Sequence, residues 1–151
     1  MAPGIATQLE SRAEDVANGV VGVVKRMPAS AHLRFVVDIA PGMSMPMDEG
    51  DLTEVLGNLL ENAARARTTV RVAARSTPGN ATLSVSDDGP GIPAADREAV
   101  LGRGVRLDSR SGGTGLGLAI VADIVDAYGG RLDLADADPG LRVAITLPRR
   151  G

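Results

Sequence analysis

The segment from Asp51 to Arg65 constrains the fold more than any other part of this sequence. It predicts an amphipathic helix, because apolar residues recur every three or four positions and form one broad face. The opposite face carries Asn58 and Asn62, which lie one turn apart. Asparagine is a mediocre helix former, so two amides on one face need a functional explanation. The apolar face consists of Leu52, Val55, Leu56, Leu59, Leu60 and Ala63.

Composition excludes several classes of function. The chain has 151 residues, which suits one domain spanning residues 1–151, and residues 1–10 are expected to be a flexible terminus without a signal-peptide pattern. The absence of cysteine excludes disulfides, thiolate metal sites and a cysteine nucleophile. A net charge of −3 gives no indication of a nucleic-acid partner. Because Lys25 is the only lysine, an anion site would need arginine, backbone N–H groups or a metal ion.

The pattern of helices and strands predicts an α+β fold. Strand pairs adjacent in sequence indicate hairpins, so we expect a mixed, mostly antiparallel sheet with three main helices on one face, a two-layer α/β sandwich. Ser11–Glu14 fits a capping box for the first helix, and Asp48 fits the cap of the second. The predicted strands are 32–39, 69–74, 82–86, 131–135 and 141–147, and the predicted later helices are a short one over 94–101 and a longer one over 116–128.

The polar face of the central helix has two interpretations. A solvated surface would explain its charged residues. Asn58 and Asn62 indicate more, because amide oxygens are neutral ligands that suit Mg²⁺ when phosphate oxygens supply other ligands. Arg65 lies on the same stripe, one turn further, where a guanidinium could contact a phosphate.

The stretch SDDGPGIP, residues 86–93, follows a predicted strand. An ordinary turn is one interpretation, and residues 89–94 also match the dinucleotide pattern G-x-G-x-x-A. We reject the dinucleotide interpretation, since Pro90 and Pro93 remove N–H donors that a pyrophosphate would need and the two adjacent aspartates would repel it.

A carboxylate at a strand end suits a hydrogen-bond donor instead. The exocyclic amine of adenine is such a donor, and a charge-assisted bond to Asp87 would contribute roughly 1.5–3 kcal/mol. Gly89 and Gly91 would let a flat ring approach the backbone.

The stretch SGGTGLGLAI, residues 111–120, places four glycines ahead of an apolar helix. Exposed N–H groups at a helix N-terminus can bind an anion. The P-loop lysine is absent. Residues 93–113 lie between the two glycine-rich stretches and include Arg106 and Arg110, which is typical either of a mobile lid or of an ordinary surface loop.

Together these three stretches resemble the ATP-binding catalytic domain of bacterial sensor histidine kinases, within the superfamily that includes gyrase, Hsp90 and MutL. LTEVLGNLLENA resembles the N box, DDGPGIP the G1 box and GTGLGLAI the G2 box, in the family's order and spacing. Residues 87–93 with REAVLGRGVR look most like the PhoQ-type kinases. The resemblance covers about residues 33–147 and implies the Bergerat ATP-binding fold.

The resemblance also implies roles for individual residues. Asn62 would be the principal Mg²⁺ ligand, Asn58 would contact the phosphates or the same ion, and Asp87 would accept from adenine. Arg106 and Arg110 would reach the γ-phosphate from a lid over 93–113, so Asn58 and Arg106 would be the catalytic pair. Other implied contacts are Arg65 to phosphate, the pocket residues Gly89, Gly91 and Ile92, the triphosphate-binding run Gly113, Thr114, Gly115, Leu116, Gly117 and Leu118, and Thr146 supporting adenine through water.

The implied function is transfer of the γ-phosphoryl group of Mg·ATP to a histidine on a separate dimerisation domain of the same parent protein. A response regulator would act downstream, and no nucleic acid would be involved. His32 lacks the H-[ED]-x-x-P context, so the phosphoaccepting hairpin is expected to be absent from this chain. The family further implies a cytoplasmic, monomeric catalytic piece of an inner-membrane sensor.

Two alternatives remain open. A freestanding serine kinase of the anti-sigma-factor type has the same fold, but such members carry a glutamate four residues before the metal asparagine, where this chain has Asn58. An inactive nucleotide-binding interaction module is the other, because Leu101 stands where the family usually has the lid's phenylalanine and Ala66 where many members have an aromatic residue.

Overall fold

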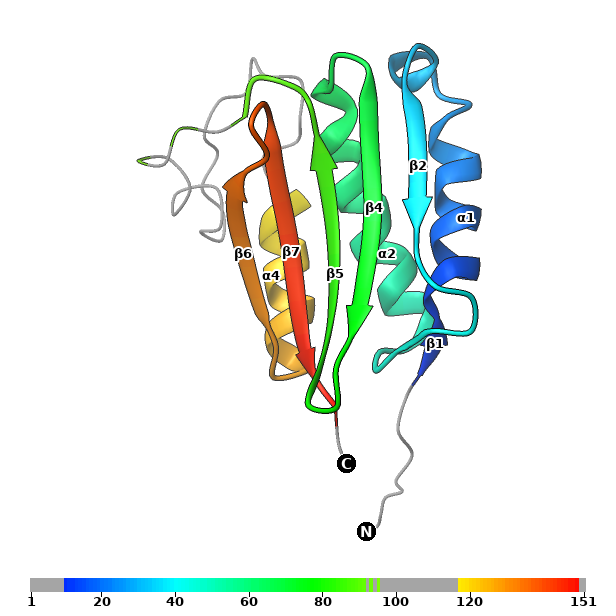
Figure 1. Cartoon of the computed structure of the whole chain (residues 1–151), viewed down its shortest axis with the longest axis vertical. Helices are drawn as coiled ribbons and strands as arrows, with labels where there is room; N and C mark the ends of the chain where they lie inside the picture. The colour runs from blue at the N-terminus through cyan, green and yellow to red at the C-terminus, as the bar shows by residue number, and fades with distance from the viewer. Residues whose placement is uncertain (1–9, 92, 94, 96–116, 150–151) are drawn as a thin grey trace, which may run out of the picture.

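A computed structural model describes residues 10–91, 93, 95 and 117–149, which form a sheet covered by helices on one face (Figure 1). The described residues share one hydrophobic core. None of the helices in this described part is long and apolar enough to cross a membrane. The elements are β1 Ser11–Arg12, α1 Ala13–Val24, η1 Pro28–Ser30, β2 Arg34–Asp38, β3 Ser44–Met45, α2 Glu49–Asn62, η2 Ala63–Arg65, β4 Thr69–Ser76, β5 Asn80–Asp87, α4 Gly117–Ala127, β6 Arg131–Asp136 and β7 Leu141–Pro148.

The main sheet has five strands in the order β2-β4-β5-β7-β6. The β2–β4 pair is parallel and the other three pairs are antiparallel. This confirms the predicted mixed, mostly antiparallel sheet. The parallel pair follows from connectivity, because α2 lies between β2 and β4 in the chain and a parallel pair needs such a crossover.

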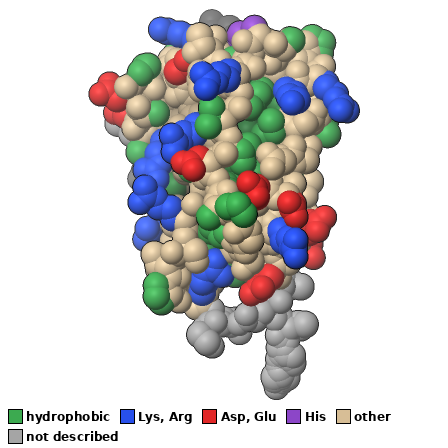
Figure 2. All heavy atoms as spheres, turned by 45° about the vertical axis from the view of Figure 1, so that its right-hand side comes forward, with side chains coloured by type: hydrophobic (Ala, Val, Ile, Leu, Met, Phe, Trp, Pro, Cys, Tyr) green, Lys and Arg blue, Asp and Glu red, His purple; other side chains and the backbone are tan. Residues whose placement is uncertain are grey.

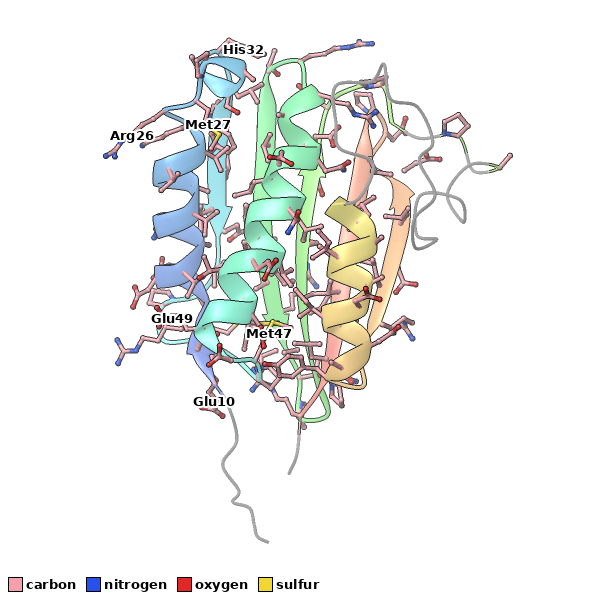
Figure 3. The ribbon with its side chains drawn as sticks, turned by 180° about the vertical axis from the view of Figure 1, so that it is seen from behind. Glu10, Arg26, Met27, His32, Met47 and Glu49 are labelled. Atoms are coloured by element: carbon pink, nitrogen blue, oxygen red, sulfur yellow. The ribbon has the colours of Figure 1, made fainter. Side chains whose placement is uncertain are left out.

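Helix α2 lies in the middle of the helix layer, between α1 and α4 (Figures 1 and 3). Its apolar stripe is fully buried, as the sequence predicts; Leu52, Val55, Leu56 and Leu60 have no exposed surface. Alternate residues of β4 and β5, such as Val70, Val72 and Leu83, point into the same core. Because its buried face is fixed in this way, α2 presents its polar residues in a defined direction.

The N-terminus of α2 is held by its predicted cap. The Asp48 carboxylate accepts from the N–H groups of Gly50 (2.9 Å) and Asp51 (3.3 Å). The Asp48 N–H donates to the hydroxyl of Tyr128 (3.1 Å), which itself donates to the Asp51 carboxylate (2.6 Å). Tyr128 follows α4, so this network joins the start of α2 to the end of α4. Burial, followed by the bond to Asp51, raises the pKa of the Tyr128 phenol.

One local prediction is wrong. Ser11 is no helix cap, because Ser11–Arg12 pairs with β3 and the Ala13 N–H donates to the carbonyl of Met43. Strand pairing therefore replaces the capping box. Its partner Ser44–Met45 thereby forms the short strand β3. The short helix predicted over 94–101 falls almost entirely outside the described residues.

The cap of α2 gives a test of this local structure. Asp48→Ala should lower the free energy of unfolding by about 1 kcal/mol, because two N–H groups of the first turn lose their acceptor. Asp48→Asn is the matched control, since asparagine caps as well as aspartate. Urea titration measures both; equal stability of Asp48→Ala and the wild type would contradict the assigned cap.

Candidate functional site

The carboxylate of Asp88 joins the end of β5 to the loop that follows η2. Its Oδ1 accepts from the N–H groups of Arg67 (2.8 Å), Thr68 (3.0 Å) and Thr69 (3.2 Å), and its Oδ2 accepts from the Thr68 hydroxyl. The Thr68 hydroxyl, and next the Thr68 N–H, hold the pKa of Asp88 well below its usual range. From the sequence, Asp88 is predicted only to repel anions; its role in positioning residues 67–69 is visible only in the structure.

Asp87 is a nearly buried acceptor at the end of β5, with 9% of its surface exposed. Burial raises the pKa of Asp87, while the N–H groups of Gly89 and Leu141 and the Arg65 guanidinium oppose that rise. The N–H groups of Gly89 (2.9 Å) and Leu141 (3.4 Å) both donate to Oδ1. Among the described residues, Oδ2 of Asp87 is thus left to accept from an external donor.

Two glycines allow the chain to pack closely around Asp87. A Cβ on Gly89 would lie 2.7 Å from the carbonyl oxygen of Arg65, so no larger residue fits between β5 and η2 without moving backbone. A Cβ on Gly140 would lie 1.8 Å from the carbonyl oxygen of Asp87, and its φ of +99° also favours glycine. The β6–β7 turn therefore closes against the end of β5.

Asn58 lies next to the start of α4. Its Nδ2 donates to the carbonyl of Glu54 (2.8 Å), an orientation assigned from the hydrogen-bond network, and among the described residues no donor is assigned to its Oδ1. A Cβ on Gly117 would lie 3.3 Å from this Oδ1. The N-box helix and the last part of the glycine-rich stretch therefore meet at Asn58.

The structure thus brings most of the described candidates to one end of the helix layer. Asn58 contacts Gly117, while Arg65 lies beside Gly89 and acts electrostatically on Asp87. Asn62, half-exposed, is the last residue of α2, and Gly91 packs near Gly140. Leu118 is buried in the core. The predicted contacts Ile92, Arg106, Arg110, Gly113, Thr114, Gly115 and Leu116 lie outside the described residues, as does most of the predicted lid.

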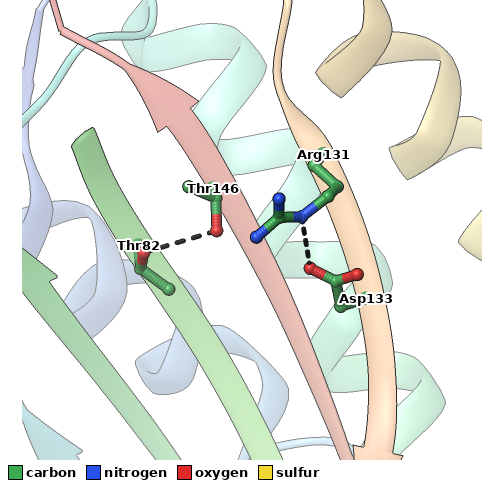
Figure 4. A network of polar contacts seen from close by, with 4 residues as sticks. All are labelled: Thr82, Arg131, Asp133 and Thr146. Carbon is green, nitrogen blue, oxygen red and sulfur yellow. Dashed lines mark hydrogen bonds and ion pairs between the residues drawn. The ribbon is translucent and has the colours of Figure 1, made fainter. Parts of the chain in front are cut away.

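Thr146 does not join this site. Its hydroxyl lies 3.4 Å from that of Thr82, its partner on β5 (Figure 4). Asp87 and Thr82 are five positions apart on one strand, so their side chains point to opposite faces of the sheet. The predicted water-mediated role of Thr146 at adenine is therefore wrong; Thr146 lies on the face away from the helices.

Comparison with known proteins agrees with this geometry. Residues 47–151 match the family described as histidine kinase-, DNA gyrase B- and HSP90-like ATPases. The chain belongs to this family, and its fold is that of the ATP-binding catalytic domain of sensor histidine kinases.

Among individual relatives, sensor protein kinase CarS of Pseudomonas aeruginosa is 47% identical over 82% of this chain and 28% of its own length. Two-component sensor PhoQ of the same organism is 48% identical over 68% of this chain and 23% of its own length. The chain thus spans about a quarter of these relatives. The structure of mycobacterial sensor histidine kinase MprB is 33% identical, with a TM-score of 0.79 over 95% of this chain and 99% of that one.

The Asp88 contacts predict a pH-dependent loss of stability. Asp88→Ala should lower the free energy of unfolding at pH 7 by roughly 1–2 kcal/mol. This value lies toward the lower end of the range for hydrogen bonds to charged groups, because the carboxylate is open to solvent. Since the folded-state pKa is depressed, this contribution is complete above the unfolded pKa near 3.8, shrinks as pH falls below that value, and is lost as pH falls through the folded-state pKa.

Urea titrations at pH 7 and pH 3 measure the difference. Asp133→Ala is the control, because it removes only an exposed pair with Arg131 (2.8 Å; Figure 4) and should cost less than about 1 kcal/mol. An Asp88→Ala difference no larger than this control at pH 7 would show that Asp88 does not hold the loop.

Proposed function

We propose that this domain binds Mg·ATP and presents the γ-phosphoryl group to a histidine on a dimerisation domain of its parent protein. One observation carries the proposal. A single segment, α2 with η2, contacts the glycine-rich stretch through Asn58 and the acidic strand end through Arg65. A polar helix face, a phosphate-binding loop and a buried acceptor therefore border one site.

Asp87 would recognise adenine. Oδ1 is occupied by two N–H groups, which fix the carboxylate, and Oδ2 can accept from the exocyclic amine. Guanine carries a carbonyl oxygen at that position, so it would place an acceptor against an acceptor. The nearly buried position strengthens this selection, because little water competes for the carboxylate.

The described residues suit a Mg²⁺ ion that takes some of its ligands from the phosphates of the nucleotide. They contain no group of three or more His, Cys, Asp or Glu that could hold a metal, so the protein would contribute the amide oxygens of Asn58 and Asn62. The fixed Nδ2 of Asn58 leaves its Oδ1 directed at the region next to Gly117, which fits this use. When bound, Mg²⁺ would neutralise negative charge on the phosphates.

Phosphoryl transfer needs mainly positioning and charge neutralisation from the protein. Arg65 would contact phosphate, and residues 113–118 would wrap the triphosphate. Arg106 and Arg110 would approach the γ-phosphate from the lid over 93–113. A neutral imidazole is already a nucleophile, so Asn58 in place of a glutamate base favours histidine over serine as the acceptor.

The relatives support a wider assignment. Because CarS and PhoQ are sensor kinases and the chain covers about a quarter of each, we place this domain in a longer sensor protein. The catalytic domain would lie in the cytoplasm as a monomeric unit, and the parent in the inner membrane. A response regulator would receive the phosphoryl group from the histidine.

The adenine assignment is tested by nucleotide selectivity. Asp87→Asn should weaken ATP binding about tenfold or more, because the adenine amine loses a charged acceptor. Asp133→Asn on the outer sheet face should bind ATP as the wild type does. Calorimetric titrations with ATP and GTP measure this; equal affinities for the two nucleotides in both the wild type and Asp87→Asn would overturn the role of Asp87.

The metal assignment is tested by magnesium dependence. Asn62→Ala should remove the increase in ATP affinity that Mg²⁺ gives the wild type, since the ion loses its main protein ligand. Asn18→Ala removes an exposed helical asparagine on α1 and serves as the control. A wild-type magnesium response in Asn62→Ala would contradict the ligand role.

Transfer itself is tested by adding a purified histidine-hairpin domain and γ-labelled ATP. Label should appear on the histidine of the hairpin and should be lost in Asn58→Ala. ATP binding without any label on the histidine would favour the inactive nucleotide-binding module, and label on serine would favour the serine kinase.

A further inference from the structure

A groove runs between α1 and α2 on the outside of the helix layer. Its volume is about 510 Å³, and Val20 and Val23 of α1, with Met27 just after this helix, contribute apolar surface to it. Val23 is 57% exposed and Met27 is 47% exposed, and together they are two of the three large hydrophobic residues exposed in the described part of the chain. Exposed apolar side chains gathered in one concave site are typical of a binding surface.

Two glycines deepen the groove, although packing among the described residues leaves room for a side chain at both positions. Gly19 of α1 and Gly57 of α2 line it, and a Cβ added to either would meet nothing within 4 Å. Glycine inside a helix costs about 1 kcal/mol relative to alanine. Since packing within this domain does not require either glycine, the open space above them suits the close approach of another backbone.

The rim of the groove is acidic. Glu49 and Glu61 of α2 line it together with Asp15 of α1, which has Arg12 at 3.9 Å and is partly neutralised. Helices α1, α2 and α4 contain eight carboxylate residues and no lysine or arginine. Arg26, just beyond α1, points away from α2 (Figure 3).

Most basic side chains lie away from the groove, apart from Arg12 beside Asp15 and Lys25 and Arg26 between the lining residues Val24 and Met27. They gather in a column along one side in Figure 2, and Arg71, Arg75 and Arg142 occupy exposed positions on the strands, facing away from the helices. Their neighbours in sequence, such as Val70, Val72 and Val143, are buried under the helix layer. The acidic helix layer and the arginine-bearing sheet face thus give the domain two surfaces of different charge.

We propose that the α1–α2 groove docks a basic amphipathic helix of a protein partner. The apolar positions from Val16 to Met27 follow helical spacing over about 16 Å, which matches roughly three turns of a docked helix. Apolar residues on one face of that helix would pack on Val23 and Met27, and lysine or arginine residues beside them would face Glu49 and Glu61.

Charge complementarity selects this occupant over others. An anionic membrane or a nucleic acid would be repelled by the acidic rim. A second copy of this chain is disfavoured too, because its three described helices carry no basic residue. The groove lies between α1 and α2, whereas Gly117 of α4 meets α2 on its other flank, and Asn58 borders both.

The probe is a fluorescein-labelled 18-residue helical peptide with leucine on one face and lysine on the flanks. A peptide with glutamate in place of lysine, and a scrambled peptide of the same composition, are its controls. Fluorescence anisotropy with the whole chain should show saturable binding of the lysine peptide and at least about tenfold weaker binding of both controls. In amide NMR spectra, the Gly19 and Gly57 signals should shift on binding.

Two variants separate the groove from the rest of α1. Gly19→Leu fills the groove and should weaken peptide binding about tenfold or more. Gly22→Leu makes the same change on α1, also where a Cβ meets nothing within 4 Å, but outside the groove lining, and should leave binding unchanged. Thermal unfolding of both variants verifies that they fold.

The charged rim is tested in the same way. The double variant Glu49→Gln with Glu61→Gln should weaken binding of the lysine peptide, whereas Glu14→Gln with Glu54→Gln, outside the groove lining, should change it less. Four results would overturn the proposal: equal binding of the glutamate peptide, equal losses in Gly19→Leu and Gly22→Leu, no saturable binding of the lysine peptide up to millimolar concentration, or dimerisation of the wild type that Gly19→Leu abolishes.

Discussion

The carboxylate of Asp88 is the contact on which the site depends most. Three backbone N–H groups and a hydroxyl, all from residues 67–69, donate to it, and these residues follow α2 and η2 directly. The bond set therefore fixes the end of the asparagine-bearing segment against the end of β5. With that join in place, Gly89 packs on the Arg65 backbone and the neighbouring Asp87 is held in a nearly dry position. Burial raises the pKa of Asp87, so keeping this carboxylate ionised in the folded protein costs free energy. Such a cost is typical of a residue that recognises a ligand.

Local sequence patterns predicted the elements of this structure that are determined by local sequence. The apolar stripe of α2, the hairpin of β4 and β5 and the cap at Asp48 follow local rules that read directly from sequence. The motifs also predict that Asn58 and Asp87 border one nucleotide site, which is part of the proposed function. What sequence could not supply is which distant groups meet: the Thr68 N–H at Asp88, the Leu141 N–H at Asp87, and Gly140 against the β5 carbonyl. These contacts join residues 20 to about 50 positions apart through loops without periodicity.

The two errors have a common physical origin. Ser11 has a capping-box sequence, yet pairing with β3 satisfies the backbone first, so tertiary context overrides a local preference. The family resemblance implies an adenine contact for Thr146 but does not say on which face of the sheet its side chain lies. Its register against Thr82 puts it on the far face, and that register became known only from the sheet. Local propensity and motif position therefore each fail where a long-range pairing decides the outcome.

Helix α2 is the central element: one face is buried, one flank borders the proposed nucleotide site, and the other flank forms the acidic groove. In the proposed function, the asparagine face, the buried aspartate and the glycine-rich stretch bind one nucleotide. A crystal structure of the domain with Mg²⁺ and a non-hydrolysable ATP analogue tests this most directly. We expect the adenine amine on the Asp87 carboxylate, with the phosphates beside Asn58 and the start of α4 near Gly117. A nucleotide bound elsewhere, or adenine away from Asp87, would contradict it.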